Sequence, residues 1–299
     1  MPVVDVLLSG QLLFAALVTG SLYALVALGL NLVYGTMRVL NVTHGDLVIL
    51  AAYGALSGWS LAGLSPLLAV PLMAALGGLA GYALYRSVFR RLLAAGSLNA
   101  GRLEGNSLLL FFGISIILQN VVAMAFTPNI QGYQYLSDVY QLGNVSMTGN
   151  RIAALLIAGL TCIGIAVFLS HSVAGLAMRA VIEKREAAYV VGVNVDRVQS
   201  FSFVIGFATA ALGGVLISML EQFSPFSGFP FTIAGFIVII LGGLGNVTAG
   251  LVAALLLGVI ETYGVALTSA NLRSVLLYGA FVATLLLFPR GVFSRSVRH

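Results

Sequence analysis

Long stretches without a charged residue dominate the chain. Residues 6–37, 47–85, 105–137, 198–220 and 222–260 contain no Asp, Glu, Lys or Arg. A helix needs roughly 20 apolar residues to cross a bilayer core of about 30 Å, so several stretches can each hold one crossing. A membrane β-barrel would alternate apolar and polar residues along each strand, whereas the run 251–257 does not alternate. The pattern therefore predicts an all-α, polytopic membrane protein.

Polar and turn-forming residues divide these stretches into candidate helices. We expect helices near residues 12–35, 45–63, 66–87, 107–127, 151–170, 199–220, 230–243, 247–263 and 273–289. The stretch 222–260 is interrupted by Gly242-Gly243-Leu244-Gly245-Asn246. Either two short helices meet at this break, or one long helix accompanies a re-entrant segment, which a membrane tolerates where protein covers it. The sequence thus predicts eight or nine spans in a single transmembrane domain over residues 1–299.

Composition narrows the class of protein. The 299 residues are 60% hydrophobic and only 8% charged, whereas soluble domains carry about 25% charged residues. A soluble fold is therefore excluded. The chain has no dense basic run with aromatic residues, which argues against nucleic acid as a partner. Cys162 is the single cysteine, so neither a disulfide framework nor a cysteine metal site is expected.

The distribution of positive charge predicts the orientation in the membrane. Cytoplasmic loops carry an excess of Lys and Arg, so we place the loop 86–106, which holds four arginines, in the cytoplasm. Counting crossings from there assigns 12 of the 14 Lys and Arg to the cytoplasmic side. The outer side receives Asp5, Asp138, Arg151, Glu221, Glu261 and Arg273. We expect a multi-pass protein of the inner (plasma) membrane with an external N-terminus and a cytoplasmic C-terminus.

One short pattern occurs twice. Asn41-Val-Thr-His-Gly45 and Asn246-Val-Thr-Ala-Gly250 share Asn-Val-Thr-x-Gly, and both precede or open an expected helix. Many transporters contain duplicated halves. The repeat reflects either such a duplication or coincidence.

The most charged window lies in a cytoplasmic segment at about 174–197. Its apolar residues form an irregular stripe opposite the charged ones, which predicts a short amphipathic helix. Arg179 and Glu183 are spaced for an ion pair, and Gly192 is suited to end the helix. Asn194 or Asp196 can cap the next helix. Such a helix either rests at the lipid headgroups or docks a cytoplasmic partner.

The pattern Glu186-Ala187-Ala188-x-x-x-Gly192 resembles the signature of the membrane subunits of ABC importers. In those proteins it forms a coupling helix that fits a groove on the ATPase subunit. The general form continues to Ile-x-Leu-Pro, whereas this chain has Phe201-Ser202-Phe203-Val204, which points to a subfamily. The resemblance implies that ATPase coupling involves Arg179, Glu183, Glu186, Ala187, Ala188 and Gly192.

Further motifs along the chain are similar to those of the LivH-type branched-chain amino acid permeases. They are the segments 31–35, 40–47, 192–198, 203–206, 241–246 and 288–293, together with Gly250 and Gly258. The resemblance implies one non-catalytic half of an ATP-driven importer. The expected partners are ABC ATPase subunits, a second permease and an external binding protein. The cargo would be branched-chain or related amino acids, or urea or amides.

The chain itself is not expected to be an enzyme or to hold a cofactor. It contains no Gly-x-x-x-x-Gly-Lys-Ser/Thr phosphate loop, the motif that cradles nucleotide phosphates. ATP hydrolysis is therefore assigned to separate subunits.

Polar residues within the expected spans are candidates for the pathway or a gate, because ionisable groups in membranes are costly. We expect His44 and Asp46 to begin the second helix near the inner face, and Glu221 and Glu261 to form a solvated outer rim. No further ligands accompany His44 and Asp46, so no metal site is expected. Polar residues within spans line the pathway or bond neighbouring helices. The candidates are Asn31, Asn41, His44, Asp46, Gln119, Asn120, Gly242, Gly243 and Gly245.

The alternative function is a secondary transporter driven by an ion gradient. That class uses substrate and ion sites near the bilayer midplane, typically at broken helices. No expected span carries a charge near its middle, which favours the importer, although the break at 242–246 would suit a secondary transporter. A membrane enzyme is the third hypothesis. It would need catalytic side chains clustered at one depth, and only His44 and Asp46 approach such a cluster.

Overall fold

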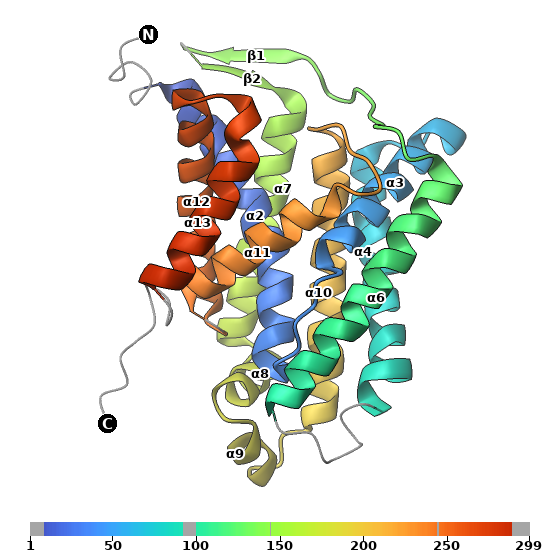
Figure 1. The fold of residues 1–299 in the computed structure, drawn as a ribbon, viewed down its shortest axis with the longest axis vertical. Helices are drawn as coiled ribbons and strands as arrows, with labels where there is room; N and C mark the ends of the chain where they lie inside the picture. Colours follow the sequence, from blue (N-terminus) through green and yellow to red (C-terminus); the bar gives the residue numbers. More distant parts are fainter. Residues whose placement is uncertain (1–8, 92–99, 144, 244, 289–299) are drawn as a thin grey trace.

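The computed structural model describes residues 9–91, 100–143, 145–243 and 245–288, and in 100–103 the backbone alone (Figure 1). Within these residues, eight helices are long and apolar enough to cross a membrane. The elements are α2 (Gly10–Met37), α3 (His44–Ala62), α4 (Pro66–Leu84), the π-helical turn η1 (Tyr85–Phe89), α6 (Ala100–Phe126), β1 (Val139–Leu142), β2 (Val145–Thr148), α7 (Gly149–His171), α8 (Val173–Glu183), α9 (Arg185–Val190), α10 (Val195–Ser218), α11 (Gly228–Gly242), α12 (Val247–Leu267), the 3₁₀ turn η2 (Ala270–Leu272) and α13 (Arg273–Leu287).

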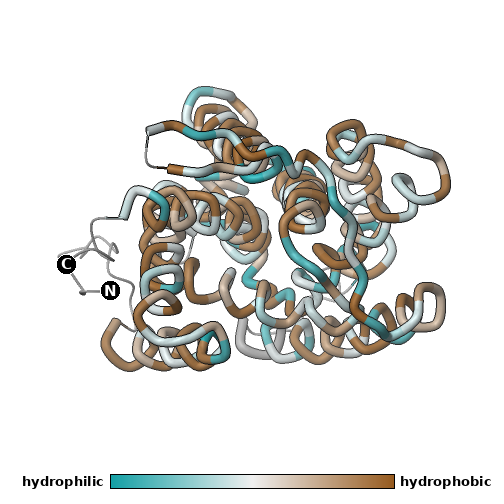
Figure 2. The backbone as a smooth tube through the Cα atoms, turned by 90° about the horizontal axis from the view of Figure 1, so that it is seen from above, coloured by the Kyte–Doolittle hydropathy of each residue, from teal (hydrophilic) through white to brown (hydrophobic). Residues whose placement is uncertain are grey.

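The helices form one bundle with two different ends. The antiparallel hairpin β1–β2 lies at one end, and α8 and α9 lie at the other (Figure 1). We call them the hairpin end and the α9 end. Hydrophobic residues dominate the helices, while polar residues gather in connecting segments (Figure 2). The fold confirms the prediction of an all-α, polytopic membrane protein.

Local sequence determines where several helices begin. The side chains of Ser9, Ser65, Ser172, Asn194 and Asn246 each accept a hydrogen bond from a backbone N–H in the first turn that follows. Such caps satisfy donors that would otherwise have no partner at a helix start. Pro66 adds a residue suited to the first helical position of α4.

Close backbone contacts hold the centre of the bundle together. Helix α10 packs against α2, α3 and α4, and α12 packs along α2. A Cβ atom on Gly29 would lie 2.6 Å from the carbonyl oxygen of Gly206, and one on Gly258 would lie 2.6 Å from the Cα of Gly20. Small residues are common at membrane helix interfaces because they allow this approach.

Helix α3 begins deep inside the bundle. The chain turns back at Arg38, which has a φ of 57°, and residues 38–43 lead to His44. The ring of His44 bonds the carbonyl oxygen of Val26 at 3.0 Å. Val26 lies 11 residues before the last residue of α2, or about 16 Å along its axis. The prediction that His44 and Asp46 lie near the inner face is therefore wrong, because segment 38–43 re-enters the bundle.

Side chains of neighbouring helices satisfy the irregular backbone of this segment. Ser107 accepts from the N–H of Leu40 at 3.2 Å. Thr232 donates to the carbonyl oxygen of Val42 at 3.0 Å. In return, the hydroxyl of Thr43 donates to the carbonyl oxygen of Phe111 at 2.6 Å. Backbone that leaves regular structure at membrane depth requires such protein partners.

Helix α11 resolves the ambiguity of residues 222–260. It has 15 residues, or about 22 Å, and is too short to cross a core of about 30 Å. It runs obliquely through the bundle (Figure 1) and meets the full-length α12 at the break 243–246. Within the described residues, the segment thus contributes one full-length helix, α12, and one short helix, α11, to a bundle with eight long helices.

Each copy of the repeated pattern places its glycine against one end of α11. A Cβ on Gly45 would overlap the carbonyl oxygen of Gly228, at the start of α11. A Cβ on Gly242, at its other end, would lie 2.6 Å from the backbone nitrogen of Gly250. The two copies differ in their asparagines, because Asn246 caps α12 whereas Asn41 does not cap α3.

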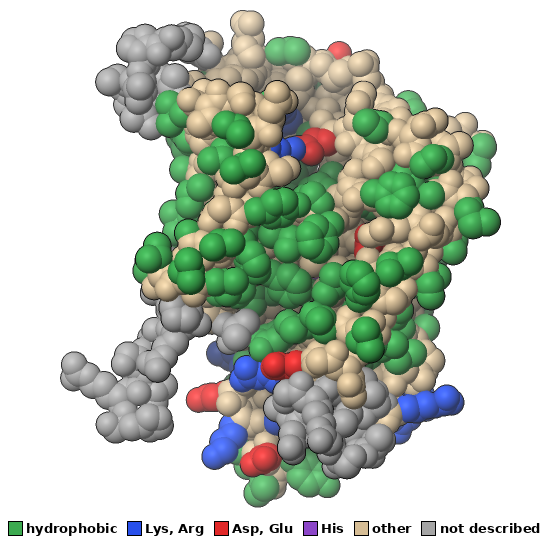
Figure 3. Space-filling view, viewed as in Figure 1, with side chains coloured by type: hydrophobic (Ala, Val, Ile, Leu, Met, Phe, Trp, Pro, Cys, Tyr) green, Lys and Arg blue, Asp and Glu red, His purple; other side chains and the backbone are tan. Residues whose placement is uncertain are grey.

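The charged residues are distributed unequally between the two ends. Basic side chains gather at the α9 end (Figure 3). These residues are Arg38, Arg86, Arg90, Arg91, Arg179, Lys184, Arg185 and Arg197. The side chain of Arg102 and all of Asp5, Arg290, Arg295 and Arg298 lie outside the described residues.

The contact between α3 and α11 predicts the effect of two alanine substitutions. We expect Gly45→Ala to lower stability by about 1–3 kcal/mol, because the added methyl group forces two backbones apart. Gly113→Ala is the matched control, since a Cβ there meets nothing within 4 Å. The melting temperatures of the purified variants in detergent test this expectation. Equal melting temperatures would contradict the contact.

Candidate functional site

The predicted coupling segment consists of two helices rather than one. Helices α8 and α9 meet at Lys184, whose backbone is extended with φ −154° and ψ 98°. The predicted ion pair between Arg179 and Glu183 is not among the contacts of the described residues. Instead, Arg179 donates to the carbonyl oxygen of Ser170 at 3.1 Å. Arg179 therefore binds the end of α7 and leaves Glu183 exposed.

The sequence signals for the end of this segment are confirmed. Gly192 follows α9 with a φ of 86°, a left-handed conformation that is costly for residues with a Cβ. Its N–H donates to the carbonyl oxygen of Tyr189 at 3.0 Å. The side chain of Asn194 then accepts from the N–H of Arg197 at 3.0 Å and caps α10. The chain thereby passes from α9 into the central helix within four residues.

Helix α9 presents apolar side chains beyond the membrane-spanning helices. The exposed fractions of Tyr189, Val190 and Val191 are 74%, 83% and 77%. Within the motif, Glu186 and Ala187 are exposed, whereas Ala188 is 3% exposed and packs inward. The motif therefore contributes one alanine to the fold and leaves the rest of the turn accessible.

The start of α10 is fixed to two other helices. The hydroxyl of Tyr85 donates to Asp196 at 2.8 Å, and Arg90 lies 3.6 Å from the same carboxylate. The side-chain amide of Gln199 donates to the carbonyl oxygen of Thr36, near the end of α2, at 3.2 Å. A cavity of about 920 Å³ lies between these residues and α9. Sequence analysis missed Tyr85 and Gln199, which the motif does not include.

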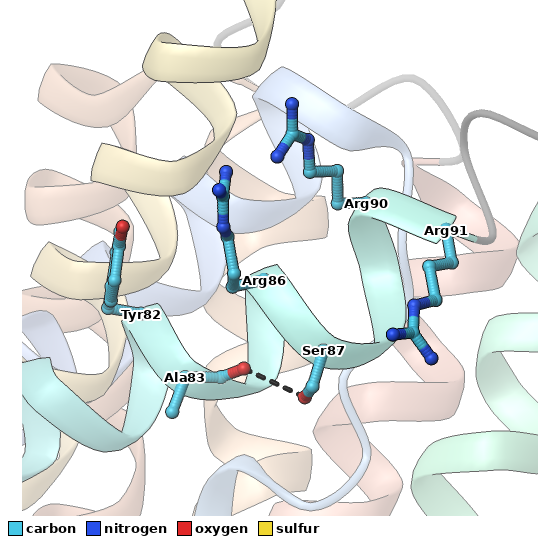
Figure 4. A pocket seen from close by; sticks show the side chains of 6 residues that line it. All are labelled: Tyr82, Ala83, Arg86, Ser87, Arg90 and Arg91. Carbon is cyan, nitrogen blue, oxygen red and sulfur yellow. Dashed lines mark hydrogen bonds between the residues drawn. The ribbon is translucent and has the colours of Figure 1, made fainter.

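Basic residues continue along the end of α4 and η1. Tyr82, Arg86 and Arg90 point to one side, and Ser87 and Arg91 point to the other (Figure 4). These five residues and Ala83 line a surface cavity of about 650 Å³. The α9 end therefore combines an exposed apolar turn with a basic surface.

A polar cluster lies in the middle of the bundle around Asp46. Gln119 donates to one carboxylate oxygen at 2.9 Å, and Ser115 donates to the other. Asp46 lies in the first turn of α3, where the helix dipole favours a negative charge. Thr232 of α11 accepts from the N–H of Gly45 at 2.9 Å. The starts of α3 and α11 and one face of α6 therefore meet at this carboxylate.

The prediction that no span carries a charge near its middle holds along α3, because Asp46 lies in its first turn, but α3 begins deep in the bundle and brings this carboxylate against the interior of α6. Ser115 and Gln119 lie 11 and 15 residues from Glu104, well inside the span Glu104–Phe126. The sequence contained a signal for part of the cluster. Ser107, Ser115 and Gln119 recur at multiples of four on α6, which places them on one face of the helix.

Two fully buried polar residues accompany Asp46. Because the ring nitrogen Nε2 of His44 bonds a carbonyl oxygen, it carries the hydrogen, and Nδ1 is left as an acceptor. Nδ1 of His44 and both polar side-chain atoms of Asn41 have no hydrogen-bond partner among the described residues. In the described part of the chain, no group of three or more His, Cys, Asp or Glu is arranged to hold a metal ion.

The other pathway candidates are separate from this cluster. Asn31 accepts from the N–H of Gly245 at 2.9 Å and donates to the carbonyl oxygen of Asn246 at 3.2 Å. It thereby holds the break between α11 and α12, beside Gly242 and Gly243. Asn120 is exposed and donates to its own helix at Ile116.

The prediction of a solvated rim is wrong for Glu261. Its side chain accepts from Tyr23 and pairs with Arg273, and the residue is 4% exposed. Glu221 also pairs with Arg273, at 3.2 Å, but its side chain is 45% exposed. The tertiary fold thus brings together charges that are distant in the sequence.

Comparison with known proteins agrees with these features. The family model described as branched-chain amino acid transport system / permease component matches residues 12–285. The chain is 28% identical over 306 residues to the high-affinity branched-chain amino acid transport system permease protein LivH of Escherichia coli (strain K12), with 95% of each chain covered.

Two further relatives come from other organisms. Identity is 29% to permease protein BraD of the corresponding high-affinity system of Pseudomonas aeruginosa, over 95% of each chain. It is 27% to the probable branched-chain amino acid transport permease protein LivH of Methanocaldococcus jannaschii, over 94% of this chain and 91% of the relative. No solved structure matches the chain significantly.

The family match spans all eight long helices of the described structure, with only the outermost ends of two of them beyond it. The chain therefore belongs to the family of permease components of branched-chain amino acid transport systems.

Proposed function

We propose that this chain is the permease subunit of an ATP-driven importer of branched-chain or related amino acids. The observation that carries the proposal is the exposed apolar turn of α9. Tyr189, Val190 and Val191 lie outside the long membrane-spanning helices and are at least 74% exposed. Exposed apolar patches with a polar rim are typical of protein interfaces. The matching partner is an ATPase subunit, as the motif Glu186–Gly192 implies.

The same proposal gives the orientation in the membrane. The α9 end carries most of the described Lys and Arg residues, and positive loops are typically cytoplasmic. We assign the α9 end to the cytoplasm and the hairpin end to the outside of an inner-membrane protein. The first described helix, α2, then starts outside, and α13 runs towards the cytoplasm.

The contacts of α10 supply a route by which ATPase movement reaches the membrane. Asp196 and Gln199 in its first turns bind Tyr85 and Thr36, and the helix continues along α2, α3 and α4. A displacement of α9 is therefore transmitted to packed helices rather than absorbed by a loose loop. ATP binding would shift the population between two openings of the pathway by favouring one of them.

The remaining subunits follow from the same assignment. We assign this chain one half of a transport pathway, and a second permease subunit, a pair of ATPase subunits and an external binding protein would complete the importer. Relatives carry names that specify branched-chain amino acid transport, which supports these amino acids as cargo. Specificity would be set mainly by the binding protein.

The secondary transporter remains the second candidate because of Asp46. A buried carboxylate beside two helix starts is the feature that the ion-driven class requires. In this chain the carboxylate is already bonded by Ser115 and Gln119. We therefore assign Asp46 a positioning role at the junction of α3, α6 and α11.

The left-handed turn after α9 gives a first prediction. We expect Gly192→Ala to reduce the ATPase that co-purifies with the tagged chain by about fivefold, because the strained turn reorients α9 at a cost of about 1 kcal/mol. Gly164→Ala in α7 is the control. A Cβ would have open space at Gly164 as well as at Gly192, but only Gly192 has a positive φ. Equal recovery from the two variants would argue against docking through this turn.

The apolar tip of α9 gives a second prediction. Val190→Asp would bury an unpaired charge in the interface and weaken ATPase binding by about 2 kcal/mol or more, roughly thirtyfold. Val173→Asp serves as the control, since Val173 is 86% exposed at the start of α8, where an acidic residue is favoured. If Val190→Asp retained the ATPase, measured by quantitative pull-down, α9 would not be the docking element.

The source of energy gives a third prediction. In vesicles that contain the whole complex, we expect uptake to require internal ATP and to persist when ionophores remove the ion gradients. Asp46→Asn keeps the oxygen that accepts from Gln119, and its amide can donate to Ser115, so ATP-driven uptake should be largely retained. Uptake that follows the ion gradient and disappears in Asp46→Asn would instead establish the secondary transporter.

A further inference from the structure

A charged cluster at the hairpin end combines residues from four parts of the chain. Arg273, the first residue of α13, binds Glu261 of α12 through Nε at 2.5 Å and Glu221 through Nη1 at 3.2 Å. Tyr23 of α2 donates to Glu261. Acidic and basic side chains lie together in a hollow among hydrophobic side chains near this end (Figure 3).

The balance of charge in this cluster is incomplete. Two carboxylates contact one guanidinium, and no second cation lies within ion-pair distance of either carboxylate among the described residues. Glu261 is buried and bonded by both Tyr23 and Arg273. Glu221 contacts only Nη1 of Arg273, and the side chains of both residues are nearly half exposed. The hydrogen bonds of Arg273 to the two glutamates use Nε and Nη1 and leave Nη2 for a further partner.

A cavity of about 220 Å³ opens beside these exposed groups. This volume is below the roughly 300–1,000 Å³ of pockets that hold drug-sized ligands, so it suits a smaller molecule. Its wall is half charged or polar and half apolar. It includes Ile217, Glu221, Phe231, Arg273, Ser274 and Leu277.

The cavity leads from the hairpin end towards the centre of the bundle. Phe231 belongs to the first turn of α11, one residue before Thr232, which bonds Gly45. A molecule in the cavity would therefore lie between the hairpin end and the cluster around Asp46. The same ion pairs border a second cavity of about 440 Å³, where Arg151 adds another positive charge. The first cavity presents one carboxylate and one guanidinium, Glu221 and Arg273, whereas the second is bordered by two of each.

We propose that the 220 Å³ cavity is a binding subsite for a zwitterionic amino acid with an apolar side chain. Glu221 binds the α-ammonium group, and the free face of Arg273 binds the α-carboxylate. Phe231, Leu277 and Ile217 contact the apolar side chain. The subsite rests on the proposed function, since it would hold the cargo as it enters the permease from the hairpin end.

Binding to the full chain in lipid nanodiscs tests the subsite. The probe is radiolabelled L-leucine, with 3-methylbutylamine and 4-methylpentanoate as competitors that lack the carboxylate and the ammonium group. We expect saturable leucine binding that is half complete at or below millimolar concentrations, and competition by both the amine and the acid. Absence of saturable binding of leucine, isoleucine and valine alike would overturn the proposal.

Glu221→Gln is the informative variant because glutamine keeps an oxygen that can accept from Arg273. We expect it to weaken leucine binding by about tenfold or more, as loss of a charge-assisted hydrogen bond would. Competition by 4-methylpentanoate should be unchanged, because that acid does not use Glu221. Asp138→Asn, an exposed carboxylate outside the cavity, should bind leucine like the native chain.

Three results would contradict the assignment. They are unchanged leucine affinity in Glu221→Gln, an equal loss of affinity for the acid competitor, and an equal effect of Asp138→Asn. The same preparations are examined for the co-purifying ATPase. Recovery of the ATPase without an effect of Glu221→Gln removes the subsite and leaves the importer. An effect of Glu221→Gln without any ATPase keeps the subsite and removes the importer.

Discussion

Backbone that leaves helical structure inside an apolar bundle must find its hydrogen-bond partners within the protein. This constraint governs the connection 38–43, which returns into the bundle and would otherwise expose several backbone groups to lipid. Ser107 and Thr232 bond this segment from two sides, and Thr43 bonds α6. The break at 243–246 is held in the same way by Asn31. The positions of α3 and α11 both depend on these bonds.

The short helix α11 connects these two irregular regions. Its ends rest on Gly45 and Gly250. A Cβ on Gly45 would overlap the carbonyl oxygen of Gly228, and a Cβ on Gly242 would lie 2.6 Å from the backbone nitrogen of Gly250. Helix α11 is too short to cross the membrane alone. Its start lies within the bundle, close to Asp46. A bundle with two helix starts at this depth can hold a carboxylate without an adjacent arginine or lysine, since helix dipoles and the hydrogen bonds from Ser115 and Gln119 stabilise it.

A charged cluster at each end of the molecule joins α10, or the segment that follows it, to neighbouring helices. At the α9 end, Asp196 joins α10 to Tyr85 and Arg90, which makes the turn after α9 mechanically continuous with the helices. At the hairpin end, Arg273 joins α12 and α13 to the segment after α10. Both clusters thus connect α10 to its neighbours. A movement at one end of α10 is therefore transmitted to the helices at the other end.

The sequence by itself determined the helical membrane fold and the α9 turn, and it limited the number of spans to eight or nine. These features depend on local composition, on the charges between the helices and on the left-handed preference of Gly192. The tertiary structure decided the depth of His44 and Asp46, the burial of Glu261 and the division of the coupling segment into two helices. Each of those depends on contacts between residues far apart in the chain. Hydrophobicity along a sequence cannot show that the connection 38–43 re-enters the bundle, because its polar residues read as a surface loop and the partners that satisfy this segment are distant in the chain.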